Sequence, residues 1–76
     1  MVRLRLHGVF AHLAGQDEVY VEVNEPTPVS ELLKNIIPRY EEFETKIILI
    51  NGKPSGEETL VSGDDEVKVL PVLSGG

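Results

Sequence analysis

Residues 27–40, Thr-Pro-Val-Ser-Glu-Leu-Leu-Lys-Asn-Ile-Ile-Pro-Arg-Tyr, decide the fold because they carry the clearest helical pattern in the chain. Thr27 is expected to cap a helix whose first position is Pro28, where a missing N–H costs nothing. Apolar residues then recur every three or four positions, as one helical face requires, and Pro38 should end the helix near Ile37. The apolar face comprises Val29, Leu32, Leu33, Ile36, Ile37 and Tyr40.

Two segments before this helix alternate apolar and polar residues. Residues 2–7 and 19–24 each show a period of two, which predicts two half-buried strands forming a hairpin. Between them, residues 9–15 predict a loop with one helical turn, anchored in the core by Phe10 and Leu13.

Two further strands are predicted after the helix. Residues 46–50 are almost continuously apolar and stop at the turn signal Asn51-Gly52, so we expect a strand buried on both faces. Residues 53–62 predict an irregular crossing with Leu60 and Val61 as core contacts. A turn at residues 63–65 precedes the last strand, residues 66–70.

The order ββαββ constrains the topology. The first and last strands can lie side by side and parallel in the centre of a mixed sheet, with one main helix packed on one face. The fold class is therefore α+β, in a β-grasp arrangement. We expect residues 1–70 to form this domain and residues 71–76 to be a flexible tail, because Pro71 should not continue strand pairing.

Composition limits the function. The chain has 76 residues, no cysteine, and a formal charge of −6, which disfavours nucleic acid and anionic membranes as partners. His7 and His12 lack a third ligand, so we expect surface histidines and no metal site. A monomeric cytoplasmic protein is expected, without a bound cofactor and without an active site of its own.

The chain ends in Gly75-Gly76. Glycine lets the backbone enter a narrow channel where any Cβ would clash, so the terminal carboxylate of Gly76 is the candidate reactive group. A carboxylate is a poor electrophile at neutral pH, and a partner enzyme would have to activate it, for instance as an acyl-adenylate. A frayed, inert terminus is the alternative.

The sheet face opposite the helix is the predicted docking surface. It should combine cations with exposed aliphatic residues, a mixture that commonly marks an interface. The tail would complete the contact with the partner. The residues expected to bind partners are Arg3, Arg5, Lys68, Leu70, Pro71, Val72, Leu73 and Ser74.

Several motifs, in order along the chain, resemble the ubiquitin-like sulfur carrier family, which includes the small subunit of molybdopterin synthase and the thiamine-pathway sulfur carrier. Phe10-Ala11 with Leu13 is similar to the Phe-Ala-x-Leu segment, Gly63-Asp64 with Glu66-Val67 to the Gly-Asp-Glu-Val turn, and residues 70–76 to the Phe-Pro-Pro-Val-Ser-Gly-Gly ending. Asp65 departs from the pattern as an insertion, and Val72 stands where the molybdopterin subunit often has proline.

The resemblance implies a carrier cycle. An E1-like adenylating enzyme would use ATP to activate Gly76, and a sulfur donor would convert it to a thiocarboxylate. The tail would then deliver sulfur to a molybdopterin synthase large subunit or another acceptor enzyme. Sulfur carriage for thiamine or tRNA thiolation, conjugation of Gly76 to lysines of other proteins, and an inert β-grasp interaction domain remain alternatives.

Overall fold

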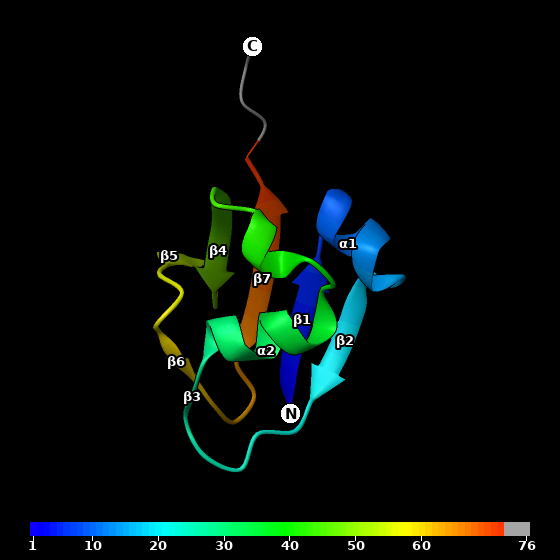
Figure 1. The fold of residues 1–76 in the computed structure, drawn as a ribbon. Helices are drawn as coiled ribbons and strands as arrows, with labels where there is room; N and C mark the ends of the chain where they lie inside the picture. Colours follow the sequence, from blue (N-terminus) through cyan, green and yellow to red (C-terminus); the bar gives the residue numbers. More distant parts are fainter. Residues whose placement is uncertain (73–76) are drawn as a thin grey trace.

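A computed structural model describes residues 1–72 of the protein (Figure 1). Its elements follow the predicted order, with short additional pieces between them. They are β1 (Val2–Leu6), α1 (Val9–Ala14), β2 (Glu18–Val21), β3 (Thr27–Pro28), α2 (Val29–Ile36), the 3₁₀ helix η1 (Tyr40–Glu42), β4 (Lys46–Ile50), β5 (Lys53–Ser55), β6 (Leu60–Val61) and β7 (Glu66–Pro71).

The main sheet has five strands in the order β2-β1-β7-β4-β5. Its central pair, β1 and β7, is parallel, with Leu4 opposite Val67, whereas β2, β4 and β5 pair antiparallel to their neighbours. The first and last strands of the chain therefore lie together in the middle (Figure 1). This is the mixed β-grasp sheet that the sequence predicts.

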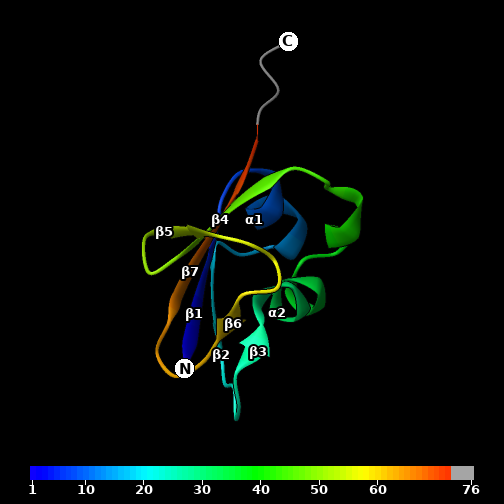
Figure 2. The same ribbon diagram turned by 90° about the vertical axis from the view of Figure 1, so that its left-hand side faces the viewer.

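Helix α2 packs across one face of the sheet, and Figure 2 shows both helices on that side with the other side bare. The helix buries Val29, Leu32 and Leu33, and Ile37 and Tyr40 follow beyond its end. These side chains meet alternate residues of the strands, because successive side chains of a strand point to opposite faces. The strand residues in this core are Val2, Leu4, Leu6, Ile48, Ile50, Val61, Val67 and Val69.

The start of α2 differs from the prediction. Thr27 does not cap the helix. It pairs in β3 with Val61 of β6, and its hydroxyl donates to the carbonyl oxygen of Glu25 at 2.9 Å. Pro28 occupies the N-cap position without a side-chain cap hydrogen bond, and the N–H groups of Val29 and Ser30 donate to the carbonyls of Thr59 and Glu57. The crossing of residues 57–61 thus caps the helix in place of Thr27.

Three further expectations were wrong in detail. Strand β4 is buried on one face only, and Ile47 on its other face is 44% exposed. Leu60 is 57% exposed, while its neighbour Val61 is buried, because β6 is a two-residue strand that alternates its side chains. Residues 9–14 form the complete helix α1, with Phe10 buried and Leu13 packed against the core.

Candidate functional site: the outer sheet face and the root of the tail

The predicted reactive residues Gly75 and Gly76, together with Leu73 and Ser74, lie outside the described residues. The structure does place the root from which they continue. Strand β7 runs through Pro71, which pairs with Lys46, one residue beyond the predicted end of pairing at Leu70. Proline is tolerated there because the end of a strand needs no further N–H donor.

Pro71 lies so near Gly8 that a side chain in place of this glycine would clash with it. A Cβ added to Gly8 would lie 2.9 Å from Cγ of Pro71, and Gly8 has a φ of +57°, a value that side chains other than glycine's rarely allow. Gly8 also stands at the N-cap of α1, so the turn between β1 and α1 forms the seat of the tail's root.

The sheet face opposite α2, called the outer face below, brings the predicted docking residues together. Lys68 lies between Arg5 of β1 and Leu49 of β4, and Leu70 lies opposite Ile47. Among residues 1–72, neither Arg5 nor Lys68 has a carboxylate within 4.0 Å. Exposed Val72 follows β7. The prediction missed Ile47 as a named contact, since its run of four apolar residues gives no alternation to reveal an outward side chain.

Arg3 also lies on the outer face but is already paired. Its guanidinium contacts Glu18 at 2.7 Å and Glu66 at 3.1 Å. The hydrogen bond with Glu18 raises the pKa of Arg3, and the same bond from Arg3 lowers the pKa of the Glu18 carboxyl. The cations that remain for a partner on this face are therefore Arg5 and Lys68.

A hollow of about 460 Å³, called the tail-root groove below, lies beside the end of β7. Its walls come from Val9 of α1, residues 42–45, and Pro71 with Val72. The ring of Phe43 meets that of buried Phe10 edge-on at 5.2 Å between centroids, which anchors the 42–45 segment to the core. No sequence pattern predicts this groove, because three segments that are distant in the chain form it.

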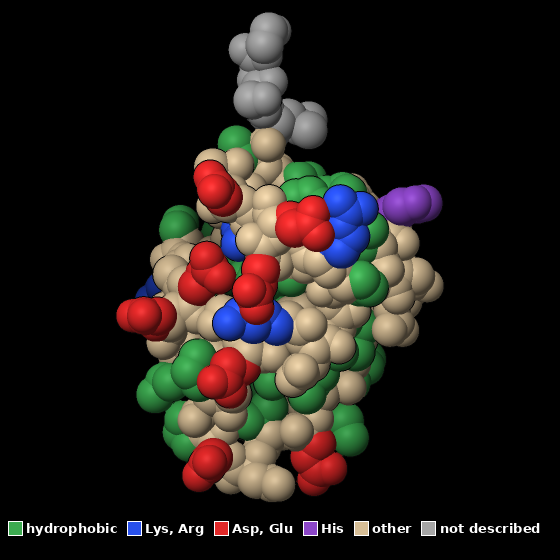
Figure 3. All heavy atoms as spheres, viewed as in Figure 1, with side chains coloured by type: hydrophobic (Ala, Val, Ile, Leu, Met, Phe, Trp, Pro, Cys, Tyr) green, Lys and Arg blue, Asp and Glu red, His purple; other side chains and the backbone are tan. Residues whose placement is uncertain are grey.

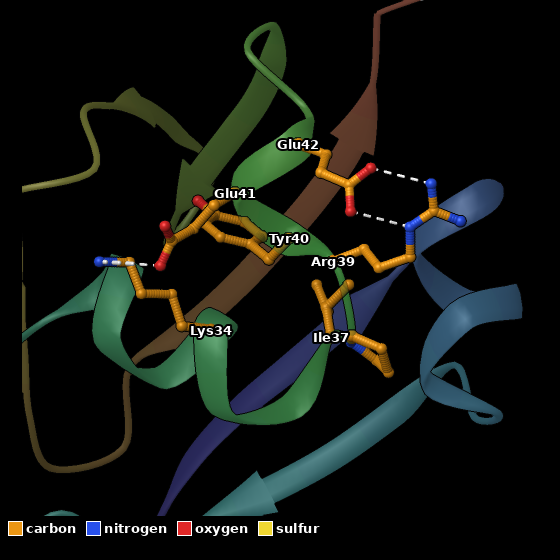
Figure 4. Close-up of a pocket in the computed structure, with 7 residues that line it drawn as sticks. Lys34, Ile37, Arg39, Tyr40, Glu41 and Glu42 are labelled. Atoms are coloured by element: carbon orange, nitrogen blue, oxygen red, sulfur yellow. Dashed lines mark hydrogen bonds and ion pairs between the residues drawn. The ribbon is translucent and has the colours of Figure 1, made fainter.

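A second hollow of about 230 Å³ lies between α2 and η1 (Figure 4). Two ion pairs flank it: Lys34 with Glu41 at 3.6 Å, and Arg39 with Glu42 at 2.8 Å. The Arg39 hydrogen bond lowers the pKa of the Glu42 carboxyl. Each charge in this hollow is thus matched by an opposite one.

Residues 1–72 offer no metal-binding cluster and no membrane-spanning helix. No group of three or more potential metal ligands is found there, and no helix in this range is long and apolar enough to cross a membrane. His12 is exposed, whereas His7 is half-buried and its Nε2 has no hydrogen-bond partner in the described part of the chain.

Comparisons with known proteins agree with this geometry. Residues 4–76 match the ThiS family. SAMP1 from Haloferax volcanii has a TM-score of 0.80 at 22% identity, covering 99% of this chain and 98% of its own, which shows a common fold. The solution structure of small archaeal modifier protein 1 from Methanosarcina acetivorans has a TM-score of 0.74 at 29% identity, covering 99% and 95%.

A putative molybdopterin converting factor, subunit 1, from Pyrococcus furiosus has a TM-score of 0.68 at 27% identity, covering 93% of this chain and 97% of its own. No curated protein matches the chain. The matched structures therefore span nearly the full length of the chain and share its fold.

Proposed function

Since the chain belongs to the ThiS family of ubiquitin-like sulfur carriers, we propose that it carries sulfur on its C-terminal carboxylate. An E1-like enzyme joins the carboxylate of Gly76 to the AMP portion of ATP and releases pyrophosphate. Hydrosulfide then attacks the acyl carbon, the bond to AMP breaks, AMP leaves, and the product is a thiocarboxylate. The tail delivers this sulfur in an acceptor enzyme of the molybdopterin-synthase type, and the chain itself supplies no other catalytic group.

The observation that carries the proposal is the ordered family match ending at Gly76, on a domain whose last strand projects from the sheet centre. In Figure 1, β7 lies beside β1 in the middle of the sheet and ends at the upper edge of the sheet. Gly75 and Gly76 have no side chains, so the terminus can enter a channel too narrow for other residues.

We propose the outer face as the surface that meets both the activating and the acceptor enzyme. Ile47, Leu49 and Leu70 form its apolar part, beside the cations Arg5 and Lys68. Apolar side chains exposed next to charges commonly mark protein interfaces. This face is continuous with the tail, so docking there would bring the terminus to a partner's active site.

Conjugation of Gly76 to lysines of other proteins is the second candidate. It is favoured by the likeness to two proteins described as small archaeal modifier protein 1. Both functions begin with adenylation and differ in the product. A thiocarboxylate turns over, whereas an isopeptide bond persists.

Deleting Gly76, or changing Gly75→Leu, should abolish adenylation by the activating enzyme of the same organism, measured as ATP–pyrophosphate exchange. Gly56→Leu is the matched control, because a Cβ at Gly56 has no atom within 4 Å, and it should retain full activity. Intact-mass analysis of protein from the native source should show replacement of one oxygen by sulfur. Activity without Gly76 would end the carrier proposal.

A further inference from the structure

The tail-root groove has apolar walls that the fold holds in place. The backbone N–H of Phe43 donates to the carbonyl of Tyr40 at 3.1 Å, and its carbonyl accepts from Nζ of Lys46 at 2.6 Å. The side chain of Lys46 is only 6% exposed and lies over the Tyr40 ring at 4.3 Å. The segment that forms one wall is therefore fixed by its backbone and by Phe10 beneath it.

The tail-root groove carries a carboxylate that no cation of the described residues neutralises. Glu42 is held by Arg39 through two hydrogen bonds of 2.8 and 2.9 Å. Glu44 is exposed, and among residues 1–72 no cation lies within 4.0 Å of it. The nearby Lys46 is directed instead to Phe43 and Glu57. In the hollow between α2 and η1, by contrast, both carboxylates are paired with a cation.

Other carboxylates lie on the same side of the molecule as the groove. Figure 3 shows carboxylates spread across the face that carries α2 and reaching its upper edge, near the end of β7. The groove is continuous with the tail through Pro71 and Val72, which line it. A partner that takes the tail must therefore bring its own surface against the groove.

We propose that the tail-root groove receives an arginine or lysine side chain from the rim of the channel into which a partner enzyme takes the tail. The aliphatic stem of that side chain lies on Val9, Phe43 and Pro71, and its charged group meets Glu44. This inference rests on the proposed function, because it assumes an enzyme that accepts the tail. It adds a contact distinct from the outer face.

Charge decides against two other occupants. The terminal carboxylate of the chain's own tail has the same sign as Glu44, so the groove repels it. A second copy of the chain brings a net charge of −6 and is repelled as well. An arginine or lysine side chain of a different protein fits the groove on both counts, because its aliphatic stem matches the apolar residues and its positive charge is opposite to that of Glu44.

The test is the KM of adenylation by the activating enzyme of the same organism. Glu44→Lys should raise the KM for the carrier about three- to tenfold with kcat unchanged, and Glu44→Gln should raise it less. Glu58→Lys makes the same change in net charge at an exposed residue outside the groove and should shift KM less than twofold. Added salt should raise the wild-type KM more steeply than that of Glu44→Gln.

Equal KM values for Glu44→Lys and Glu58→Lys would overturn the inference while leaving the proposed function intact. If the wild type is not adenylated at all, both fail together. Amide chemical shifts of Val9 and Phe43 should not change when Leu73→Gly and Ser74→Gly are made together, which keeps the terminal carboxylate at its position in the chain and alters no residue that lines the groove. A change would assign the groove to the tail, and a dimer in sedimentation that Glu44→Lys dissociates would assign it to a second copy.

Discussion

Asp65 is the residue that ties the turn before β7 to the β4–β5 hairpin. One carboxylate oxygen accepts from the backbone N–H of Ser62 at 3.0 Å, and the other accepts from the side-chain amide of Asn51 at 3.0 Å. Asn51 completes the link by accepting from the N–H of Glu66. The position that departs from the family's turn pattern therefore has a structural role in this chain.

We expect Asp65→Asn to lower the free energy of unfolding at pH 7 by about 1–2 kcal/mol. The side-chain amide of asparagine has only one acceptor oxygen. If that oxygen accepts from Ser62, the NH₂ group of the new side chain would point at the NH₂ group of Asn51, and neither could accept a hydrogen bond. The hydrogen bonds from Ser62 and then Asn51 lower the pKa of Asp65 in the folded state. Its contribution is thus present above the unfolded pKa of about 3.9 and is lost as pH falls through the folded value.

Urea unfolding from pH 7 to pH 2 checks this expectation. The difference between wild type and Asp65→Asn should shrink at the acidic end. Asp64→Asn is the control, because the Asp64 carboxylate is 95% exposed and contacts only the N-terminal ammonium. A difference between wild type and Asp65→Asn that does not depend on pH would contradict the role of the carboxylate.

At the scale of elements, sequence patterns predicted the helices and turns that depend on neighbouring residues. The stripe from Val29 to Tyr40 identified α2, and the Asn51-Gly52 turn, with φ of 53° and 83°, joins β4 to β5 as expected. The start of α2 was not predictable, because its N–H groups are satisfied by the carbonyls of Glu57 and Thr59, about thirty residues away in the chain. Tertiary contacts replaced the local cap.

The candidate site was likewise predictable only where it depends on local sequence patterns. Arg5, Lys68 and Leu70 could be assigned to one face from the period of two in their strands. The pairing of Arg3 with both Glu18 and Glu66 depends on the strand order, and the tail-root groove depends on three segments meeting at the end of β7. No pattern within a short window carries that information.

The contact between α1 and β7 gives a prediction at this scale. Gly8→Ala should lower the free energy of unfolding by about 1–3 kcal/mol, because alanine is strained at φ +57° and its Cβ would meet Pro71. Gly56→Ala, at a glycine with open surroundings, should be close to neutral. Denaturant unfolding of both variants gives the comparison.

A double-mutant cycle separates strain from contact. If Pro71 is part of the cause, Gly8→Ala should cost less in a Pro71→Ala background, with a coupling of at least about 0.5 kcal/mol. Strict additivity would mean that the backbone conformation of Gly8 alone accounts for the loss. The seat of the tail would then not depend on this contact.

The whole molecule is two-sided. The sheet divides a face covered by helices, on which Figure 3 shows many carboxylates, from a bare face seen edge-on in Figure 2. The bare face carries the cations Arg5 and Lys68 beside Arg3, which is paired with Glu18 and Glu66. Alternate residues of β7 belong to opposite sides: Val67 and Val69 are fully buried in the core, whereas Lys68 and Leu70 face outward. Adjacent positions of one strand therefore belong to the core and to the proposed docking surface.

This alternation permits a test of the docking face with neighbouring substitutions. Val69→Asp places an unpaired carboxylate in the core, a cost of several kcal/mol against a typical stability of about 5–15 kcal/mol, so thermal unfolding should show a severely destabilised domain. Leu70→Asp should leave the domain folded and lower the melting temperature far less than Val69→Asp does, because the side chain points outward and the carboxylate stays accessible to water. It should nevertheless weaken binding to the activating and acceptor enzymes about tenfold each, through the loss of about 1–2 kcal/mol of apolar contact. Calorimetric titration of each enzyme with the folded variant measures this effect, and unchanged affinity for both would exclude the outer face as their docking surface.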